Sequence, residues 1–285
     1  MLEFEDVPDL VDPVLIAAFE GWNDAGEAAS ALVRHLSEVW DAELVAAFDP
    51  EDYYDFQVNR PRVAVEEGRR VLSWPTTRIL VATETGFDRD VVLVQGIEPS
   101  MRWRAFSVEL LELAQQLGVS TIVTIGALLA DVPHTRPIPV TATAEDDTAI
   151  HRFDVEASRY EGPTGIVGVL SATASDAGVP TVSAWAAVPH YAGGSPSPKA
   201  TLSLLRRVES LLAVTIDHGD LEESARAWER GVDELAQSDE EVAEYVQSLE
   251  EAQDTAQLPE ATGDAIAREF ERYLRGRDDD PGGRP

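Results

Sequence analysis

The sequence of 285 residues has no cysteine and a single lysine, Lys199. The absence of cysteine excludes disulfide bonds, a catalytic thiolate and metal sites with sulfur ligands. Basic side chains are scarce altogether, because 22 Lys and Arg stand against 53 Asp and Glu, and the formal charge is −31. A protein with this charge repels nucleic acid and anionic lipid at long range. We therefore expect no nucleic-acid partner and no membrane partner.

Long apolar runs are also missing, since none approaches the roughly 20 residues that cross a bilayer. The first residues, 1–6, are acidic where a signal peptide is basic, so we expect a cytoplasmic protein. Hydrophobic residues nevertheless make up 44% of the chain. That content is enough to build one large α/β domain and an accessory segment.

The N-terminal part predicts a strand, a turn and a helix. Val14 to Phe19 is a short apolar run, and apolar residues then recur at helical spacing from Ala25 to Val39. Asp24 is placed to be the N-cap of this helix, with Glu27 three residues later. A second apolar run, Leu44 to Phe48, follows. The unit has the length of a parallel βαβ crossover, whose first turn lies where such sheets usually bind ligands.

The middle of the chain continues with alternating strand and helix patterns. A polar and aromatic loop is expected over 49–56, and a hairpin is expected from strands at 63–65 and 71–74. Further strands are predicted at 78–83, 91–95, 121–125, 138–144, 165–170 and 181–185. Helices are predicted at 103–117, 171–178 and 201–212, and a long loop at 126–137. The helix 103–117 and its flanking strands form a second predicted βαβ unit.

The composition changes near residue 217. From Leu221 onward Ala, Glu and Leu dominate, and their spacing predicts amphipathic helices at 221–237, 239–254 and 262–275. We divide the chain into an α/β core over 1–216, a helical extension over 217–275 and a disordered tail over 276–285. Packing of the extension on the core is the expectation, and contact with a partner is the alternative.

Polar and aromatic side chains gather where the predicted strands end, and in the loops that follow them. The candidate pocket consists of Glu20, Trp22, Asn23, Asp24, Gln95, Glu98, His134, Arg136, His190, Tyr191 and Lys199. The carboxyl ends of parallel strands share one edge of a sheet, so these residues can converge on one site. Each also has a structural explanation. Asp24 suits a helix cap, Glu20 a salt bridge, Lys199 either an anion contact or an exposed surface, and the histidines loop or capping roles.

Motifs that would name a reaction are missing. The first turn lacks the Gly-x-Gly-x-x-Gly arrangement, and its acidic residues oppose a pyrophosphate. Residues 193–200 are only superficially like a phosphate loop, because two prolines remove amide donors and Ala200 stands where a hydroxyl would hold magnesium. The histidines have no metal-ligand spacing, and no Gly-x-Ser-x-Gly elbow is present. We predict no catalytic residue, no metal and no cofactor.

Several segments together carry a family resemblance: 19–26, 126–128, 180–191 and 196–200. They resemble the proteasome assembly chaperone 2 family, and more narrowly its uncharacterised actinobacterial branch, which has a similar helical tail. The resemblance implies a three-layer α/β/α sandwich with a mostly parallel mixed sheet and a C-terminal helical extension. This architecture is similar to that of nucleoside phosphorylases, but it does not imply their activity.

Two functions remain open at this point. The first is a non-enzymatic interaction or assembly-chaperone-like protein that forms a homo-oligomer, expected to be a trimer, with a partner that is proteasome-related or of another kind. Relatives that dock on proteasomes use a terminal hydrophobic-Tyr-any tripeptide, whereas this chain ends Gly283-Arg284-Pro285, which argues against that docking mode. The alternative is a small-molecule enzyme in which Glu20 acts as acid or base while Asn23, His134, Arg136 and His190 orient the substrate.

Overall fold

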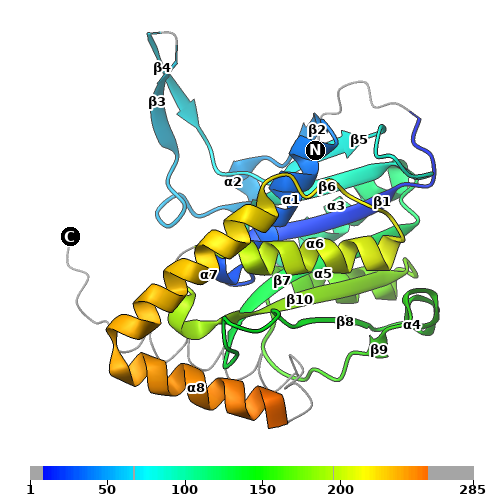
Figure 1. Cartoon of the computed structure of the whole chain (residues 1–285). Coiled ribbons are helices and arrows are strands. Elements are labelled where there is room, and N and C mark those ends of the chain that lie inside the picture. The colour runs from blue at the N-terminus through cyan, green and yellow to red at the C-terminus, as the bar shows by residue number, and fades with distance from the viewer. Residues whose placement is uncertain (1–8, 67, 195, 256–285) are drawn as a thin grey trace.

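The computed structural model describes residues 9–66, 68–194 and 196–255, and an eight-stranded sheet lies at its centre (Figure 1). The strand order is β2-β5-β6-β1-β7-β10-β8-β9. In chain order these strands are β1 (Val14–Glu20), β2 (Glu43–Ala47), β5 (Arg78–Ala82), β6 (Val91–Ile97), β7 (Thr121–Ala130), β8 (Val140–Ala144), β9 (Glu156–Ala157) and β10 (Thr181–Pro189). The four central strands β6, β1, β7 and β10 are parallel to one another. The pairs β2–β5, β5–β6 and β10–β8 are antiparallel, and β9 lies parallel to β8 at one edge.

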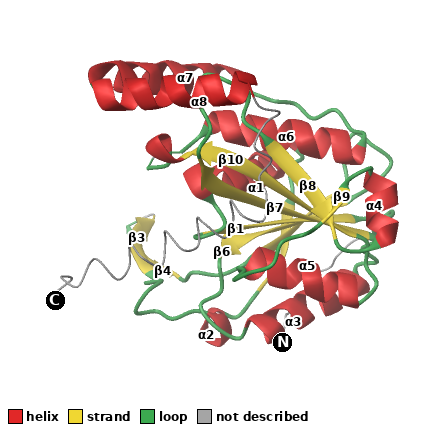
Figure 2. Ribbon diagram, turned by 90° about the horizontal axis from the view of Figure 1, so that it is seen from below, coloured by secondary structure: helices red, strands yellow, loops and turns green. Residues whose placement is uncertain are grey.

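Helices cover both faces of the sheet, which confirms the three-layer α/β/α sandwich. Figure 2 shows α1 (Ala28–Val39) and α6 (Pro198–Leu212) on one face, and α3 (Trp103–Gln116) and α5 (Ile166–Asp176) on the other. Successive side chains of β1 enter the two layers alternately: Ile16 joins the core under α1, and Phe19 joins the core under α3. A strand buried on both faces reads as a continuous apolar run, and this explains the pattern at 14–19.

The first βαβ prediction is wrong in one respect. The strand β2 does not lie parallel to β1 but pairs antiparallel with β5 at the far edge of the sheet. Both sides of β1 are taken by β6 and β7, which are parallel to it. The helix α1 therefore leads to an edge, where an antiparallel neighbour completes the sheet. The second predicted unit, β6-α3-β7, is a true parallel crossover.

The predicted strand at 165–170 is also wrong, because residues 166–176 form one helix, α5. Its buried side chains Ile166, Val167, Leu170 and Ala174 follow helical spacing and pack on the sheet. A short apolar run fits a buried strand and a buried helix segment equally well, so periodicity alone misassigned it. The full-length α5 supplies the connection that a helix over 171–178 was too short to make.

Two predicted loops are more regular than expected. The strand β7 continues to Ala130, and its last residues pair with β10 up to Pro189. The loop predicted at 126–137 is therefore shorter. Within 49–56, the helix α2 (Pro50–Tyr53) forms, and the Asp49 side chain caps it by accepting the N–H of Glu51 at 2.9 Å.

Two parts of the chain extend from the sandwich. The predicted hairpin is confirmed as β3 (Arg62–Glu66) and β4 (Arg69–Ser73), a separate two-stranded sheet that projects from the body at the upper left of Figure 1. The helices α7 (Leu221–Ser238) and α8 (Glu240–Thr255) confirm two of the three predicted extension helices, and α7 packs on α6. The third, at 262–275, and the tail at 276–285 lie outside the described residues. The domain boundary near residue 217 stays a prediction.

The remaining elements are short. The helix α4 (Asp147–Phe153) joins β8 to β9, and one 3₁₀ turn precedes α1 (Ala25–Glu27) while another follows β10 (His190–Ala192). No helix in the described part of the chain is long and apolar enough to cross a lipid bilayer.

Candidate functional site

Asp24 holds the start of α1. Its Oδ1 accepts the backbone N–H groups of Ala29 and Ser30 at 2.8 and 3.1 Å, and its Oδ2 accepts the Ser30 hydroxyl at 2.5 Å. Burial raises the pKa of Asp24, and the hydrogen bonds from Ser30 and Ala29 oppose this shift. The capping role is confirmed, but the position is corrected: α1 begins after the 3₁₀ turn, and Glu27 occupies the residue before the helix.

Asn23 and Glu98 hold the start of α5. Asn23 is fully buried and donates from Nδ2 to Glu98 Oε1 at 2.9 Å, and the same oxygen accepts the N–H of Ile166 at 2.9 Å. A carboxylate at this place satisfies a free helix N–H and suits the positive end of the helix dipole. Gly165 allows the approach, because a Cβ there would lie 2.4 Å from Asn23 Oδ1. These two candidate residues therefore position a helix.

Glu20 and Gln95 lie at the same ends of the strands without a comparable role. Glu20 is exposed, and its carbonyl oxygen accepts the N–H of Glu98 at 2.8 Å. Within the described residues its carboxylate forms no ion pair, so the salt bridge expected from the sequence is not seen there. Gln95 is half-buried in β6, where it pairs with Ala18 and Arg78.

His134 is the centre of a second group. Its imidazole is 1% exposed, with Nδ1 at 2.8 Å from the Tyr191 hydroxyl and Nε2 at 3.0 Å from Asp233 Oδ1 on α7. The Tyr191 hydroxyl also accepts the backbone N–H of His134 at 2.7 Å. Burial raises the pKa of Tyr191 to about 12. His134 thus joins the loop after β7, the turn after β10 and the extension.

Lys199 and Arg136 bind the same extension. Lys199 Nζ lies 2.5 Å from Glu229 on α7 and donates to the carbonyl oxygen of His134. Lys199 is largely buried, so it is not an exposed surface lysine, and the anion that it contacts is the carboxylate of Glu229 in the same chain. Arg136 lies 2.8 Å from Asp254 and 3.4 Å from Glu250, both on α8. The Asp254 hydrogen bond raises the pKa of Arg136, and Arg136 lowers that of Asp254.

His190 completes the contact with α8. Its ring packs edge-on against Tyr191 and Tyr245, with centroid distances of 5.7 and 5.3 Å. Its Nδ1 lies 3.4 Å from Asp131 without hydrogen-bond geometry, whereas the Tyr245 hydroxyl donates to Asp131 at 3.1 Å. These contacts therefore join seven of the candidate residues into two groups, one at the start of α5 and one that holds α7 and α8 on the core.

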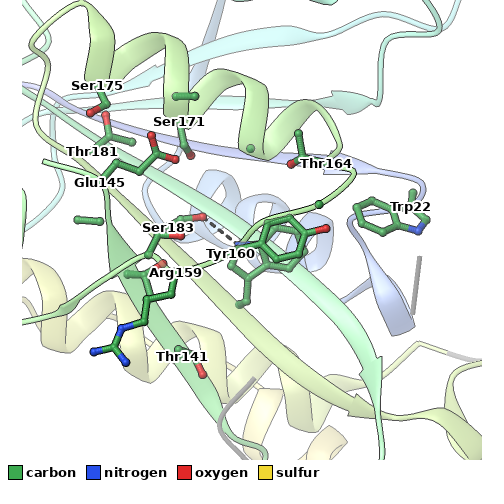
Figure 3. A pocket seen from close by; sticks show the side chains of 17 residues that line it. Trp22, Thr141, Glu145, Arg159, Tyr160, Thr164, Ser171, Ser175, Thr181 and Ser183 are labelled. Atoms are coloured by element: carbon green, nitrogen blue, oxygen red, sulfur yellow. Dashed lines mark hydrogen bonds between the residues drawn. The ribbon is translucent and has the colours of Figure 1, made fainter. Parts of the chain in front are cut away.

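A cavity of about 260 Å³ lies elsewhere, between α5, β8, β10 and residues 158–164 (Figure 3). Nine of the residues that line it carry a hydroxyl group: Thr141, Thr143, Ser158, Tyr160, Thr164, Ser171, Ser175, Thr181 and Ser183. Glu145 and Trp22 lie toward opposite ends, with Tyr160 between them. Of the candidate pocket, only Trp22 lines this cavity. Burial, with Asp176 and Asp146 nearby, raises the pKa of Glu145.

Two serines of the cavity are hydrogen-bonded to neighbouring groups. The Ser183 Oγ accepts hydrogen bonds from Thr124 Oγ1 at 2.9 Å and from Trp185 Nε1 at 3.0 Å, while Ser171 binds its own helix carbonyl at Val167. Among the described residues no histidine lines the cavity, and neither serine forms a hydrogen bond with Glu145, the carboxylate that lines it. Within the residues that the structure describes, no group of three His, Asp or Glu side chains could hold a metal ion.

Comparison with known proteins identifies the fold and its relatives. The PAC2 family model matches residues 18–236. The crystal structure of a PAC2 family protein from Streptomyces avermitilis is similar at 58% identity, covers 82% of this chain and all of that chain, and has a TM-score of 0.78. The chain belongs to the PAC2 family. None of the curated proteins matches it.

Two further structures are similar to this PAC2 chain. A Mycobacterium tuberculosis protein described as a proteasome-assembly chaperone homologue is 51% identical, with 82% of this chain and 99% of that chain covered and a TM-score of 0.75. A Pyrococcus furiosus protein, described as an archaeal homologue of proteasome-assembly chaperone, is 16% identical with a TM-score of 0.58. It covers 89% of this chain and all of that one, and shows that the fold is shared.

The sequence of the PAC2 chain did not reveal which side chains pair with Lys199, His134 and Arg136 of the core. Lys199 and His134 contact the carboxylates of Glu229 and Asp233 on α7. Arg136 contacts those of Glu250 and Asp254 on α8. The signal was present as pairs of acidic residues four positions apart, which lie on one face of a helix. An acidic helix face reads as a solvated surface, so this spacing did not indicate contact with the core.

Proposed function

We propose that this chain is a non-enzymatic, assembly-chaperone-like protein that binds another protein. We also propose that it is a cytoplasmic homo-oligomer, with a trimer as the expected state. Its proposed partner is proteasome-related. The 51% identical relative is described as a proteasome-assembly chaperone homologue, which supports this kind of role.

The observation that carries the proposal is the use that the structure makes of the polar candidate residues. His134, Arg136 and Lys199 bind carboxylates of α7 and α8, while Asn23 and Glu98 bind each other and the start of α5. These contacts occupy the imidazole of His134 and the charged groups of Arg136, Lys199 and Glu98 within the chain, and of the Asn23 amide only Nδ2 is bound while Oδ1 lacks a partner among the described residues. The alternative enzyme, with a pocket at the carboxyl ends of the strands, is therefore disfavoured.

Exposed apolar side chains support protein binding. Half of the large hydrophobic residues that are exposed in the described chain lie in one short segment: Val58, Val63, Val65, Val71, Leu72 and Trp74. Such patches on a water-exposed surface mark sites of protein contact. The enzyme alternative offers no reason for them.

The test combines a partner assay with a ligand assay. The purified full chain is mixed with isolated proteasome α-subunits of an actinobacterium, and complexes are weighed by native mass spectrometry. We expect a complex that contains both components. An unrelated protein of similar size and charge, which should form none, controls for nonspecific attraction by the acidic surface.

The same preparation is screened by thermal shift against a metabolite library. A metabolite that raises the melting temperature by several degrees and is converted to product, together with no α-subunit complex, overturns the proposal. In that case Glu20→Gln, which alters an exposed carboxylate, tests the acid or base role of the alternative enzyme.

A further inference from the structure

The face of the sheet that α5 covers is polar at the edge formed by β8 and β10. Side chains of these two strands alternate between the two helix layers. Those in the layer of α6 are apolar: Val140, Ala142, Val182, Ala184 and Ala186. Those that line the cavity under α5 include four hydroxyl groups: Thr141, Thr143, Thr181 and Ser183. A sheet face covered by a helix is normally apolar, so this choice of residues calls for an explanation.

The helix α5 leaves room above these hydroxyl groups. Four of its residues line the cavity: Gly168, Ser171, Ala172 and Ser175. Their spacing places them on one face of the helix, and all four are small. Protein interiors are usually filled by larger side chains to a high packing density. The small residues of α5 therefore keep the cavity of about 260 Å³ open above the sheet.

Several hydroxyl groups in the wall have no protein partner. The side chains of Thr143, Ser158, Thr164 and Ser175 form no hydrogen bond with another described residue. In Figure 3 Ser175 lies toward the end marked by Glu145, and Thr164 lies toward the end marked by Trp22. A hydroxyl group both donates and accepts hydrogen bonds. Groups spread along the cavity in this way can bind a ligand that itself carries hydroxyl groups.

One end of the cavity is negatively charged. Glu145 lines it and forms no ion pair in the part of the chain that the structure describes. Burial and the nearby carboxylates of Asp176 and Asp146 raise the pKa of Glu145. Asp176 is also the last residue of α5, and the C-terminal end of a helix carries a partial negative charge. Arg159 lines the cavity too, but in Figure 3 it extends away from Glu145. This end therefore attracts a cationic group.

Aromatic rings line the rest of the cavity. Tyr160 lies between Glu145 and Trp22, and Trp185 belongs to β10. The Tyr160 hydroxyl donates to the carbonyl oxygen of Pro163, and Trp185 Nε1 donates to Ser183. Because these polar atoms are already bound, Tyr160 and Trp185 offer the cavity mainly their ring faces. An aromatic face is partly negative and packs well on the C–H groups of a saturated carbon skeleton.

We propose that this cavity binds a small hydroxylated amine. The ammonium group lies at Glu145, the hydroxyl groups of the ligand bind the unpartnered serine and threonine side chains, and the carbon skeleton packs on Tyr160. Pockets for drug-sized ligands hold roughly 300–1,000 Å³, so a cavity of about 260 Å³ suits a smaller molecule, of the size of an amino sugar. No residue of α7 or α8 lines the cavity, so the site is separate from the contacts of the extension.

The experiment compares three probes on the purified full chain. D-glucosamine carries both an ammonium group and hydroxyl groups, D-glucose lacks the ammonium group, and cyclohexylamine lacks the hydroxyl groups. Binding is measured by saturation-transfer NMR and isothermal titration calorimetry. We expect D-glucosamine to bind, and each of the other two probes to bind about 10-fold more weakly or less, since each loses one set of contacts.

Two variants locate the site. Glu145→Gln keeps the shape of an exposed side chain and removes its charge, and it should weaken D-glucosamine binding about 10-fold. Ala172→Leu fills the cavity from α5 without a change of charge and should abolish binding. The matched control is Glu112→Gln, which removes an exposed carboxylate on α3 and should leave the affinity unchanged. Circular dichroism and thermal unfolding show whether each variant folds.

Three outcomes overturn the inference. The first is that no probe binds at concentrations up to about 10 mM. The second is that D-glucose or cyclohexylamine binds as tightly as D-glucosamine, because the class of ligand is then wrong. The third is that Glu145→Gln binds D-glucosamine as the wild type does, and this variant decides the matter even if Ala172→Leu does not fold. The α-subunit assay is independent of the cavity, so each of these outcomes leaves the chaperone-like role intact.

Discussion

The helical extension and the arm, which is the hairpin segment 58–66 and 68–74 that contains β3 and β4, both project from the sandwich. They differ in how far their apolar side chains are exposed to solvent. The extension buries Val232 and Ala236 of α7 and Val246 of α8, and polar groups of the core bind its carboxylates. The arm keeps its valines and Trp74 in water. Both segments contain apolar side chains such as valine, so apolar content alone does not decide which segment packs on the core of its own chain. Within the described residues, the core supplies several charged partners for the extension but only one side-chain hydrogen bond for the arm, from Asn59 Nδ2 to Ser100 Oγ at 3.1 Å.

The largest expected effect comes from removing the central polar anchor of the extension. His134→Ala deletes a buried imidazole and leaves the Tyr191 hydroxyl and Asp233 without it. We expect the free energy of unfolding to fall by about 2–4 kcal/mol. Hydrogen exchange should also become faster in α7. Urea unfolding and exchange mass spectrometry measure both, and His151→Ala, at an exposed site on α4, is the control.

If stability changed by less than about 0.5 kcal/mol and hydrogen exchange in α7 were unchanged, polar contacts with the core would not be what holds the extension. Apolar packing alone would hold it. The arm and the extension would then differ only in the surface that each finds.

A smaller effect is expected when a single hydroxyl of the same group is removed. Tyr191→Phe deletes the hydroxyl that contacts the backbone N–H and the ring Nδ1 of His134. The free energy of unfolding should fall by about 1–2 kcal/mol at neutral pH. The pKa of Tyr191 is raised from 10.0 to about 12, so the folded state holds this proton more tightly than the unfolded state. Its contribution is complete below pH 10 and is lost as the pH rises toward 12.

The pH dependence gives a direct check on that anchor. The stability difference between wild type and Tyr191→Phe should shrink between pH 10 and about 12. Unfolding curves across this range, recorded for both proteins, measure it. A difference that stays constant would show that the hydroxyl is not held as the structure places it.

One substitution in the extension is expected to stabilise the fold. Gly231 lies in α7 with no atom within 4 Å of a Cβ built there, and its backbone is helical. Gly231→Ala should therefore raise the free energy of unfolding by about 0.5–1 kcal/mol. Gly168→Ala in α5 is the matched control, because its Cβ would lie 2.0 Å from Thr164 Oγ1 and no gain is expected. Equal effects at both positions would contradict the account.

The smallest effect is expected in the arm. Val65→Thr keeps the β-branched shape of an exposed side chain, so the stability of the isolated monomer should change by less than about 0.5 kcal/mol. Val232→Thr makes the same change at a buried position of α7 and should cost about 1–2 kcal/mol, because the hydroxyl loses water. Chemical unfolding at low protein concentration compares the two. Similar losses at both sites would remove the distinction between the arm and the extension.

Local sequence patterns predicted the fold where the chain interacts with near neighbours. The run at 14–19, the helix after Asp24, the hairpin and the helices α7 and α8 all follow from periodicity and caps. The failures concern long-range choices. Whether β2 joins β1 or β5 depends on which edges are already occupied, and no local signal encodes that. The run at 166–170 fits two periods, and only its place against the sheet decides for the helix.

The candidate residues show the same limit. Asp24 acts on residues five and six positions away, so its capping role could be predicted. The partners of His134 and Arg136 lie about 100 residues further along the chain, in helices whose docking the sequence did not reveal. His134, Arg136 and Lys199 bind the protein's own extension, whereas Asn23 and Glu98 bind the start of α5. Sequence alone does not distinguish such internal contacts from a ligand site.

The central place of β1 also has a consequence for how the chain is made. Val14 pairs with Val91 on one side and with Thr121 on the other, so both edges of the first strand stay open until β6 and β7 have been synthesised. At roughly 5–20 residues per second, a ribosome exposes this apolar strand for seconds before either neighbour arrives. A PAC2 chain built in this way therefore keeps an apolar strand uncovered while the rest of its sheet is still being synthesised.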